Sequence, residues 1–258
     1  MHETVAELSE RIREAPSDQA LFLERGIAYS SDGKVELAFA DFRKAEALGE
    51  PDLVAFDLGV LFYRTGEFAP ARAALTRCLA RFPAHALALD YRARAAREAG
   101  DSRAALADFE ALFALVEGVN PGHYVSAADL LLTLSGEGAP AALAVLDRGM
   151  RQLGVIPQLQ QRAIALERDR GSLGAALLRH DTLAEQFARS PDWRATRAEL
   201  LFALGRVEEA RSELSAATAA LAELRATPAR AELAAKIARL AQTPETTRAG
   251  ERDAQETP

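Results

Sequence analysis

The sequence has a single cysteine, Cys78, among its 258 residues. One cysteine excludes an internal disulfide framework and any metal site that needs several thiolates. Histidine is also scarce, and the histidines lie far apart, without the i, i+4 spacing of a helical metal pair. The four histidines are His2, His85, His123 and His180. We therefore expect no metal site in this protein.

The signatures of common enzymes and cofactor sites are missing as well. The sequence contains no G-x-S-x-G nucleophile turn, no phosphate-binding G-x-x-x-x-G-K-[ST] loop and no dinucleotide-binding G-x-G-x-x-G. Cys78 and His180 fall on packing positions, where we expect a buried thiol and a hydrogen-bonded core histidine. Carboxylate pairs such as Glu208 and Glu209 lie on predicted solvated helix faces. The sequence thus predicts a protein that is not an enzyme and that holds no cofactor.

Long apolar runs are absent. None approaches the roughly 18 to 20 residues that a helix needs to cross a bilayer, so we expect no membrane span. The N-terminus is charged from Glu3 on and lacks the apolar core of a signal peptide. For the chain as written, the cytoplasm is the expected compartment. If the chain is a mature form whose signal peptide has been removed, the expected compartment is the periplasm or another exported location.

An excess of basic charge is lacking too. The 31 lysines and arginines are outnumbered by 38 aspartates and glutamates, which gives a formal net charge of -7. Proteins that bind nucleic acid gain affinity from a basic surface that releases counterions, so nucleic acid is not an expected partner. Only three of the basic residues are lysine. The bias toward arginine and alanine suggests a GC-rich bacterial genome.

Six glycines recur with a regular period. They are Gly33, Gly66, Gly100, Gly136, Gly171 and Gly205, and an alanine follows each one five residues later. Successive glycines lie 33, 34, 36, 35 and 34 residues apart. In most units a large side chain stands nine residues after the glycine and a small residue seven before it. This pattern predicts pairs of closely packed helices, each joined at a glycine that takes the left-handed conformation of a helix end.

The repeating unit resembles the tetratricopeptide repeat, which has about 34 residues per helix hairpin. In the first two units the resemblance rests on Phe22, Gly26, Tyr29, Ala38, Phe42 and Pro51, then on Leu58, Gly59, Phe62, Ala71, Leu75 and Pro83. The fourth and fifth units match less well, with Asp129 and Ile164 where the family usually has a small residue. The resemblance implies an all-α fold, a right-handed superhelical solenoid of about six hairpins with a capping helix at each end.

The chain is expected to form one domain with a helix covering each end of the repeats. At the front, Val5, Leu8 and Ile12 form an apolar stripe on a short helix. At the back, Thr227 and Pro228 have the sequence of a helix start. The expected parts are an N-terminal capping helix in residues 1–15, the repeats in residues 17–225, a C-terminal capping helix in residues 227–241 and a disordered tail in residues 242–258.

In tetratricopeptide solenoids the first helix of each unit lines a concave groove that holds an extended peptide or a partner's helix, and the resemblance implies the same here. Helical spacing places one face of each first helix in this groove. The predicted partner-binding residues are Leu23, Ile27, Phe56, Val60, Tyr63, Tyr91, Arg94, Arg97 and Arg168. Such a groove is apolar at its front and rich in arginine in its middle. The expected partner is a protein or peptide with an apolar anchor followed by acidic residues, because arginine can hold a carboxylate with two hydrogen bonds.

A plainer interpretation of these residues stays open. In it the arginines are merely solvated, and the front aromatic residues pack under the N-terminal helix. One known use of the family is not expected. Co-chaperone members hold a C-terminal carboxylate with lysines and asparagines, whereas here Leu23 and Ile27 occupy the clamp positions of the first unit and Asp57 that of the second.

The predicted function is a non-catalytic scaffold for protein–protein interaction. Two alternatives stay open. The chain could be an accessory or regulatory subunit of a neighbouring bacterial enzyme, or a self-assembling scaffold in which an end helix or the groove packs on a second copy.

Overall fold

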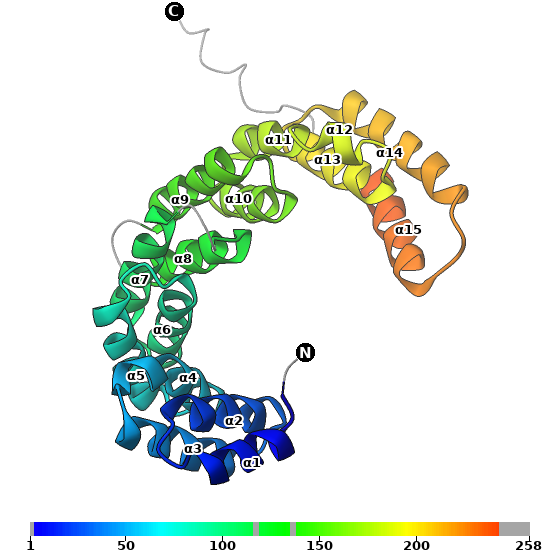
Figure 1. The fold of residues 1–258 in the computed structure, drawn as a ribbon. Coiled ribbons are helices and arrows are strands. Elements are labelled where there is room, and N and C mark those ends of the chain that lie inside the picture. Colours follow the sequence, from blue (N-terminus) through cyan, green and yellow to red (C-terminus); the bar gives the residue numbers. More distant parts are fainter. Residues whose placement is uncertain (1–2, 116–118, 135–137, 243–258) are drawn as a thin grey trace, which may run out of the picture. The chain divides into compact units, whose positions relative to one another are not determined.

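The computed structural model describes residues 3–115, 119–134 and 138–242, and in these ranges the chain is helical, with no β-strand. The helices, labelled in Figure 1, are α1 (Val5–Glu14), α2 (Gln19–Ser31), α3 (Val35–Leu48), α4 (Pro51–Arg64), α5 (Phe68–Arg81), α6 (Ala86–Glu98), α7 (Ser102–Ala114), α8 (Pro121–Thr133), α9 (Gly138–Leu153), α10 (Pro157–Asp169), α11 (Leu173–Asp181), α12 (Ala184–Phe187), α13 (Pro191–Ala203), α14 (Val207–Ala222) and α15 (Pro228–Ala241). The chain divides into two compact units, Met1–Ala142 and Leu143–Pro258, with the boundary inside α9. The predicted all-α class is confirmed.

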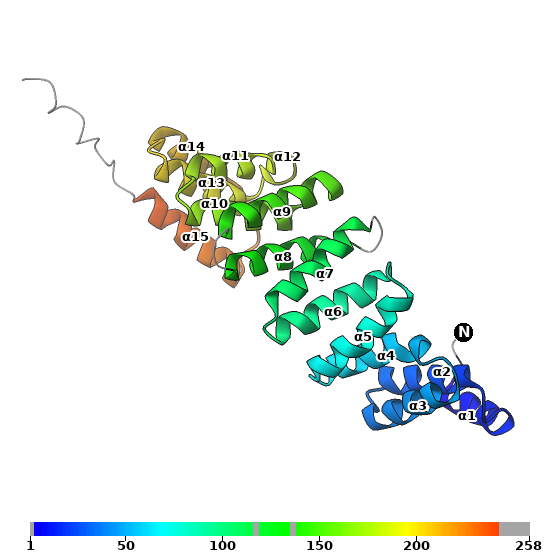
Figure 2. The same ribbon diagram turned by 90° about the vertical axis from the view of Figure 1, so that its left-hand side faces the viewer.

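Within each unit the helices pack as consecutive pairs. The first unit pairs α2 with α3, α4 with α5, and α6 with α7, and the second pairs α10 with α11 and α13 with α14. Successive pairs of the first unit also touch, through α3 with α4 and α5 with α6 (Figure 2). These contacts confirm the predicted stack of helix hairpins.

The predicted turn glycines join these pairs. Gly33, Gly66, Gly100, Gly171 and Gly205 have φ angles of 74°, 81°, 77°, 74° and 73°. At the first turn the Gly33 N–H donates to the carbonyl of Ser30 at 3.2 Å, and the Lys34 N–H donates to the carbonyl of Tyr29 at 2.8 Å. The same two bonds recur at the other four turns and satisfy the last carbonyls of the first helix. The sixth predicted turn glycine, Gly136, lies outside the described residues.

Close packing of a small residue against a large one is visible in the first two pairs. A Cβ atom built on Gly26 would lie 2.6 Å from two ring carbons of Phe42, and one on Gly59 would lie 2.5 Å from Cγ of Leu75. Real Cβ contacts are longer than this, so only glycine lets the two helices of each pair approach so closely. At these two turns the pairing of a small and a large residue is therefore a packing contact, as the sequence predicted.

A largely buried ion pair also repeats, and it spans eight residues on either side of a turn glycine. Arg25 of α2 donates to both carboxylate oxygens of Asp41 on α3, at 2.7 and 2.8 Å. It also donates to the hydroxyl of Ser9 on α1 at 3.0 Å. One guanidinium thus joins three successive helices. The equivalent sets are Arg92 with Asp108 and Thr76, and Arg197 with Glu213 and Asp181.

Each end of the described chain carries a helix that packs on the repeats. α1 contacts α2 and buries Leu8, which is 2% exposed, while α15 contacts α13 and α14 and buries Ile237 at 5%. A capping role for both helices, and the boundaries of the predicted parts, remain predictions. Of the tail predicted to be disordered, only Gln242 lies within the described residues.

The fifth repeat departs from a regular hairpin, because its second helix is split into α11 and the single turn α12. Near the break, the indole N–H of Trp193 donates to the carbonyl of His180 at 3.3 Å, and the two rings lie 4.7 Å apart. His180 is buried, as expected. It is not fully hydrogen-bonded, however: among the described residues nothing pairs with its Nδ1 atom.

Candidate functional site

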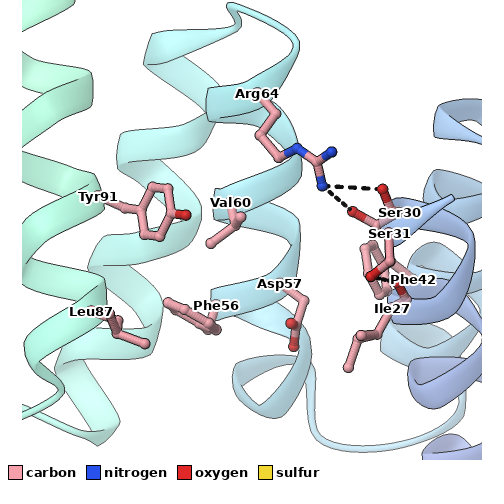
Figure 3. Close-up of a pocket in the computed structure, with 10 residues that line it drawn as sticks. All are labelled: Ile27, Ser30, Ser31, Phe42, Phe56, Asp57, Val60, Arg64, Leu87 and Tyr91. Atoms are coloured by element: carbon pink, nitrogen blue, oxygen red, sulfur yellow. Dashed lines mark hydrogen bonds between the residues drawn. The ribbon is translucent and has the colours of Figure 1, made fainter. Parts of the chain in front are cut away.

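The first compact unit, Met1–Ala142, contains a hollow of about 310 Å³, which we call the front pocket (Figure 3). It is bordered mainly by α2, α4 and α6. Its lining residues are Ile27, Ser30, Ser31, Phe42, Phe56, Asp57, Val60, Arg64, Leu87 and Tyr91. Four of the predicted partner-binding residues are among them. These four are Ile27, Phe56, Val60 and Tyr91.

Helical spacing explains why these side chains meet. On α4, Phe56 and Val60 are four residues apart and therefore share one face of the helix. Figure 3 shows α4 between α2, which carries Ile27, and α6, which carries Tyr91. The three helices are the first members of consecutive pairs, so the pocket lies on the face where the sequence predicted a groove.

Aromatic side chains form one wall of the pocket. Phe56 meets Tyr91 edge to face with 6.3 Å between ring centroids, and Tyr63 meets Tyr91 in the same way at 5.5 Å. His85 lies against the other side of Phe56, at 4.6 Å. Such contacts hold the rings in place, so Phe56 and Tyr91 form a preformed apolar surface. Tyr63 belongs to this wall although it does not line the pocket itself.

Leu23, the remaining apolar residue of the prediction, has a different environment. It packs against the buried cluster that contains Phe22 and Phe42, and Ile12 of α1 packs against the same cluster. Leu23 is half-buried and does not line the front pocket, and its place in a partner-binding groove stays a prediction.

Two opposite charges lie at different ends of the pocket. Arg64, near the end of α4, donates through Nη1 to the carbonyl and hydroxyl oxygens of Ser30, at 3.1 and 3.2 Å. Asp57 lies two helical turns earlier on α4 (Figure 3). Among the residues that the structure describes, no other residue forms a hydrogen bond or an ion pair with the Asp57 side chain. Burial raises its pKa to about 6, against a hydrogen bond from its own backbone N–H.

Arg94 stands beside the aromatic wall and already has a partner within the chain. It binds Asp90, one turn earlier on α6, through Nε at 2.9 Å and Nη2 at 2.8 Å, and its guanidinium lies 5.8 Å from the Tyr91 ring centroid. Burial acts to raise the pKa of Asp90, but hydrogen bonds from His123 and Arg94 outweigh it and bring the pKa below its ordinary value. Arg94 therefore neutralises a buried carboxylate.

The other two predicted arginines are also ion-paired. Arg97 contacts its neighbour Glu98 at 3.0 Å, with both side chains more than 40% exposed. Arg168 belongs to the second unit, where it binds Glu199 at 2.6 Å. The structure brings Arg94 close to the pocket wall, whereas Arg97 and Arg168 line no part of the front pocket.

Several pocket residues were not among the predicted partner-binding residues, namely Ser30, Ser31, Phe42, Asp57, Arg64 and Leu87. The spacing of Asp57, Val60 and Arg64 on α4 contained the signal, because positions three and four apart share a face. Asp57 had been considered only as a departure from the carboxylate clamp. Leu87 follows from the same rule, since it lies four residues before Tyr91.

The described residues include no group of three or more His, Cys, Asp or Glu side chains that could hold a metal ion. No helix in the described part of the chain combines the length and the apolar character that a membrane span requires.

Comparison with known proteins gives a structural answer only. Neither protein-family models nor curated protein sequences match this chain. Among solved structures, a tetratricopeptide repeat protein from Parabacteroides merdae has a TM-score of 0.55 and 19% identity, covering 86% of this chain and 87% of that chain. PilF of Pseudomonas aeruginosa has a TM-score of 0.52 and 16% identity, covering 76% and 88%. A structure of Naa15/Naa10 bound to HypK has a TM-score of 0.55 and 14% identity, covering 87% of this chain but 34% of that chain.

Identities this low concern the fold alone, and at that level the likeness agrees with the geometry. The helices are paired in order, left-handed glycines join the two helices of a pair, and in the first two pairs a glycine faces a large side chain. The chain therefore has the tetratricopeptide repeat fold.

Proposed function

We propose that this chain is a non-catalytic scaffold that binds a peptide or a partner's helix at the front pocket and on the groove face around it. The observation that carries the proposal is apolar exposure on both sides of α4. Ile27 is 41% exposed and Leu87 is 57% exposed, and both line the pocket. Apolar side chains that remain exposed around a hollow are typical of surfaces that bind other proteins.

The pocket suits an apolar anchor of the partner. Phe56 and Tyr91 supply a rigid aromatic wall, and Val60 supplies the floor between them. Burial of one leucine-sized or phenylalanine-sized side chain contributes roughly 1.5 to 3 kcal/mol, which is the scale of a binding hot spot. The solved complex of Naa15/Naa10 with HypK is consistent with protein binding by this fold, although its identity to this chain is low.

Acidic residues after the anchor remain part of the proposal. Arg94 uses two of its five N–H groups for Asp90, and its side chain is 41% exposed, so a partner's carboxylate can share the guanidinium. Arg97 is exposed and its pair with Glu98 is a surface contact, which exchanges readily. Arg168 lies in the second unit and would serve only a partner that also extends along that unit.

A pull-down from lysate of the source organism tests the proposal with three forms of the protein. The groove variant carries Phe56→Ala and Tyr91→Ala. The control carries Leu37→Ala, which removes an apolar side chain of similar exposure, 49%, from α3, outside the pocket. Circular dichroism first establishes that the three forms are equally helical.

We expect a protein that wild type and the Leu37→Ala control retain and the groove variant loses. A partner that all three forms retain equally would move the binding site away from the front pocket and contradict the proposal.

A further inference from the structure

The front pocket holds a carboxylate, that of Asp57, to which no cation of the described residues is paired. We infer that this pocket receives a lysine or arginine side chain of the partner segment, with its cationic group on Asp57 and its aliphatic stem along Phe56 and Val60. The inference rests on the proposed function and adds the chemistry of the partner to it.

Asp57 is half-buried and differs from the aspartates that the first unit buries more deeply. Asp41 and Asp108 each receive two hydrogen bonds from an arginine of the same chain, and Asp90 receives one from Arg94, whose Nη2 atom also lies 2.8 Å from it. In the described ranges no cation reaches Asp57 in this way, and Figure 3 shows its carboxylate beside Ile27. The fold therefore supplies a cation to these three buried carboxylates and leaves Asp57 to an outside group.

Partial burial has removed water from the Asp57 carboxylate. Burying a carboxylate without a partner disfavours its charged form, which is the cause of the raised pKa of Asp57, about 6. Folding has already removed much of the water from this group. A cation that enters the pocket therefore gains the attraction at a smaller further desolvation cost than at a fully solvated carboxylate.

The shape of the pocket favours a cation on a long apolar stem. Lysine and arginine place their methylene groups on apolar surface while their charged ends reach a polar atom. The ring faces of Phe56 and Tyr91 also attract cations. Arg64 is the opposing charge on the same helix, but seven residues separate it from Asp57, which is roughly 10 Å along a helix, and Ser30 holds it at the other end.

Other charged or titratable groups near Asp57 come from three helices. Asp52 and Arg64 lie on α4, Cys78 on α5, and His85 at the start of α6. The α2 residues that line the pocket are uncharged. A lower pH adds a proton to Asp57 and so weakens its hold on a cation, and an Asp57→Asn variant separates this effect from that of His85.

A displayed library of random peptides of about twelve residues tests the inference, because peptides of this length span a groove. Four forms of the full chain are selected against it: wild type, Asp57→Asn, the Phe56→Ala and Tyr91→Ala groove variant, and Asp52→Asn. The last removes a carboxylate from the same helix at a position that does not line the pocket.

We expect wild type and Asp52→Asn to enrich peptides with a lysine or arginine beside an apolar residue. The Asp57→Asn pool should keep the apolar preference and lose the basic one, and the groove variant should lose both. Equal basic enrichment with Asp57→Asn, or apolar peptides without a basic residue from wild type, would overturn the inference and leave the proposed function in place. No enrichment by any form would contradict the proposed function as well.

The strongest wild-type peptide then gives a quantitative test. Its affinity near pH 7.5 should fall about tenfold with Asp57→Asn, and a peptide with glutamine in place of its basic residue should bind both forms equally. Wild-type affinity should weaken between about pH 7 and pH 5, because Asp57 takes up a proton in that range, and Asp57→Asn should lose this part of the dependence. A peptide whose basic residue matters equally to both forms would place its cation elsewhere.

Discussion

Arg25 connects three helices through one guanidinium. Its role is therefore structural, although its side chain is charged. Its side chain is 18% exposed and that of Asp41 is 8% exposed, so the pair is largely removed from water. The hydrogen bond to Asp41 raises the pKa of Arg25, although burial opposes this. Arg92 and Arg197 repeat the arrangement in the pair of α6 with α7 and in the pair of α13 with α14.

Removing one partner of the Arg25–Asp41 pair should lower the free energy of unfolding more than replacing both partners with apolar residues. We predict that Asp41→Ala lowers the free energy of unfolding by about 2 to 3 kcal/mol, at or below the usual range for a buried pair because Arg25 keeps some contact with water. The double variant Arg25→Met, Asp41→Leu should lose less, because no charge is left buried alone. Urea denaturation followed by circular dichroism measures both changes.

A matched surface pair provides the control for this prediction. Glu208 contacts Arg211 with side chains 85% and 46% exposed, and Glu208→Gln should change the free energy of unfolding by less than about 0.5 kcal/mol. If Asp41→Ala is as mild as Glu208→Gln, the three-helix contact has little energetic weight and this account of Arg25 is wrong.

At the scale of helices and turns, the glycine period contained most of the fold. Gly33 and Gly66 mark turns because a left-handed residue there lets the last carbonyls find donors, and this need repeats with each hairpin. The break between α11 and α12 had no such signal. It involves contacts of Trp193 with residues of another helix, and a local sequence pattern does not contain contacts of that kind.

From the sequence, helix register could predict which side chains share the groove face, but not which of them become buried by other helices. Phe56 and Val60 were placed on the groove face by counting back from a turn glycine, and both line the pocket. Register alone could not tell that Leu23 would pack against the buried cluster around Phe22 and Phe42 instead of lining the pocket, since that depends on tertiary packing. The partner of Arg94 was visible in sequence, because Asp90 precedes it by one helical turn.

His180 makes the stability of its unit depend on pH. Burial lowers the pKa of its imidazole below the ordinary 6.5, against the nearby carboxylate of Asp181 and with the help of Arg197. Below pH 6.5 the unfolded chain therefore binds more protons at this position than the folded chain, so folded stability falls as the pH falls.

We predict that the melting midpoint of wild type drops more between about pH 7 and pH 5 than that of His180→Gln, which cannot take up the proton. Thermal melts followed by circular dichroism at a series of pH values measure the difference. All other titrating groups are common to the two proteins. Parallel curves over this range would mean that His180 is protonated as easily in the folded chain as in the unfolded one.

At the scale of the whole molecule, most tertiary contacts join helices that are neighbours in sequence. A fold of this kind tolerates change in one pair without loss of the others, because each pair depends mainly on the pairs beside it. It also repeats the same helix face along the chain. Specificity in a scaffold of this kind must therefore come from residues that differ between repeats, and in our proposal these are the residues that line the front pocket.

The central claim is that this pocket contacts another protein, and site-specific photo-crosslinking in living cells of the source organism tests it most directly. A benzophenone side chain replaces Leu87 at the rim of the pocket in one form and Leu37 on α3 in the other, at 57% and 49% exposure. The account predicts a discrete adduct with a different protein from position 87, lost when Phe56→Ala is added, and no such adduct from position 37. Equal adducts from both positions, or an adduct from position 87 only with a second copy of this chain, would contradict it.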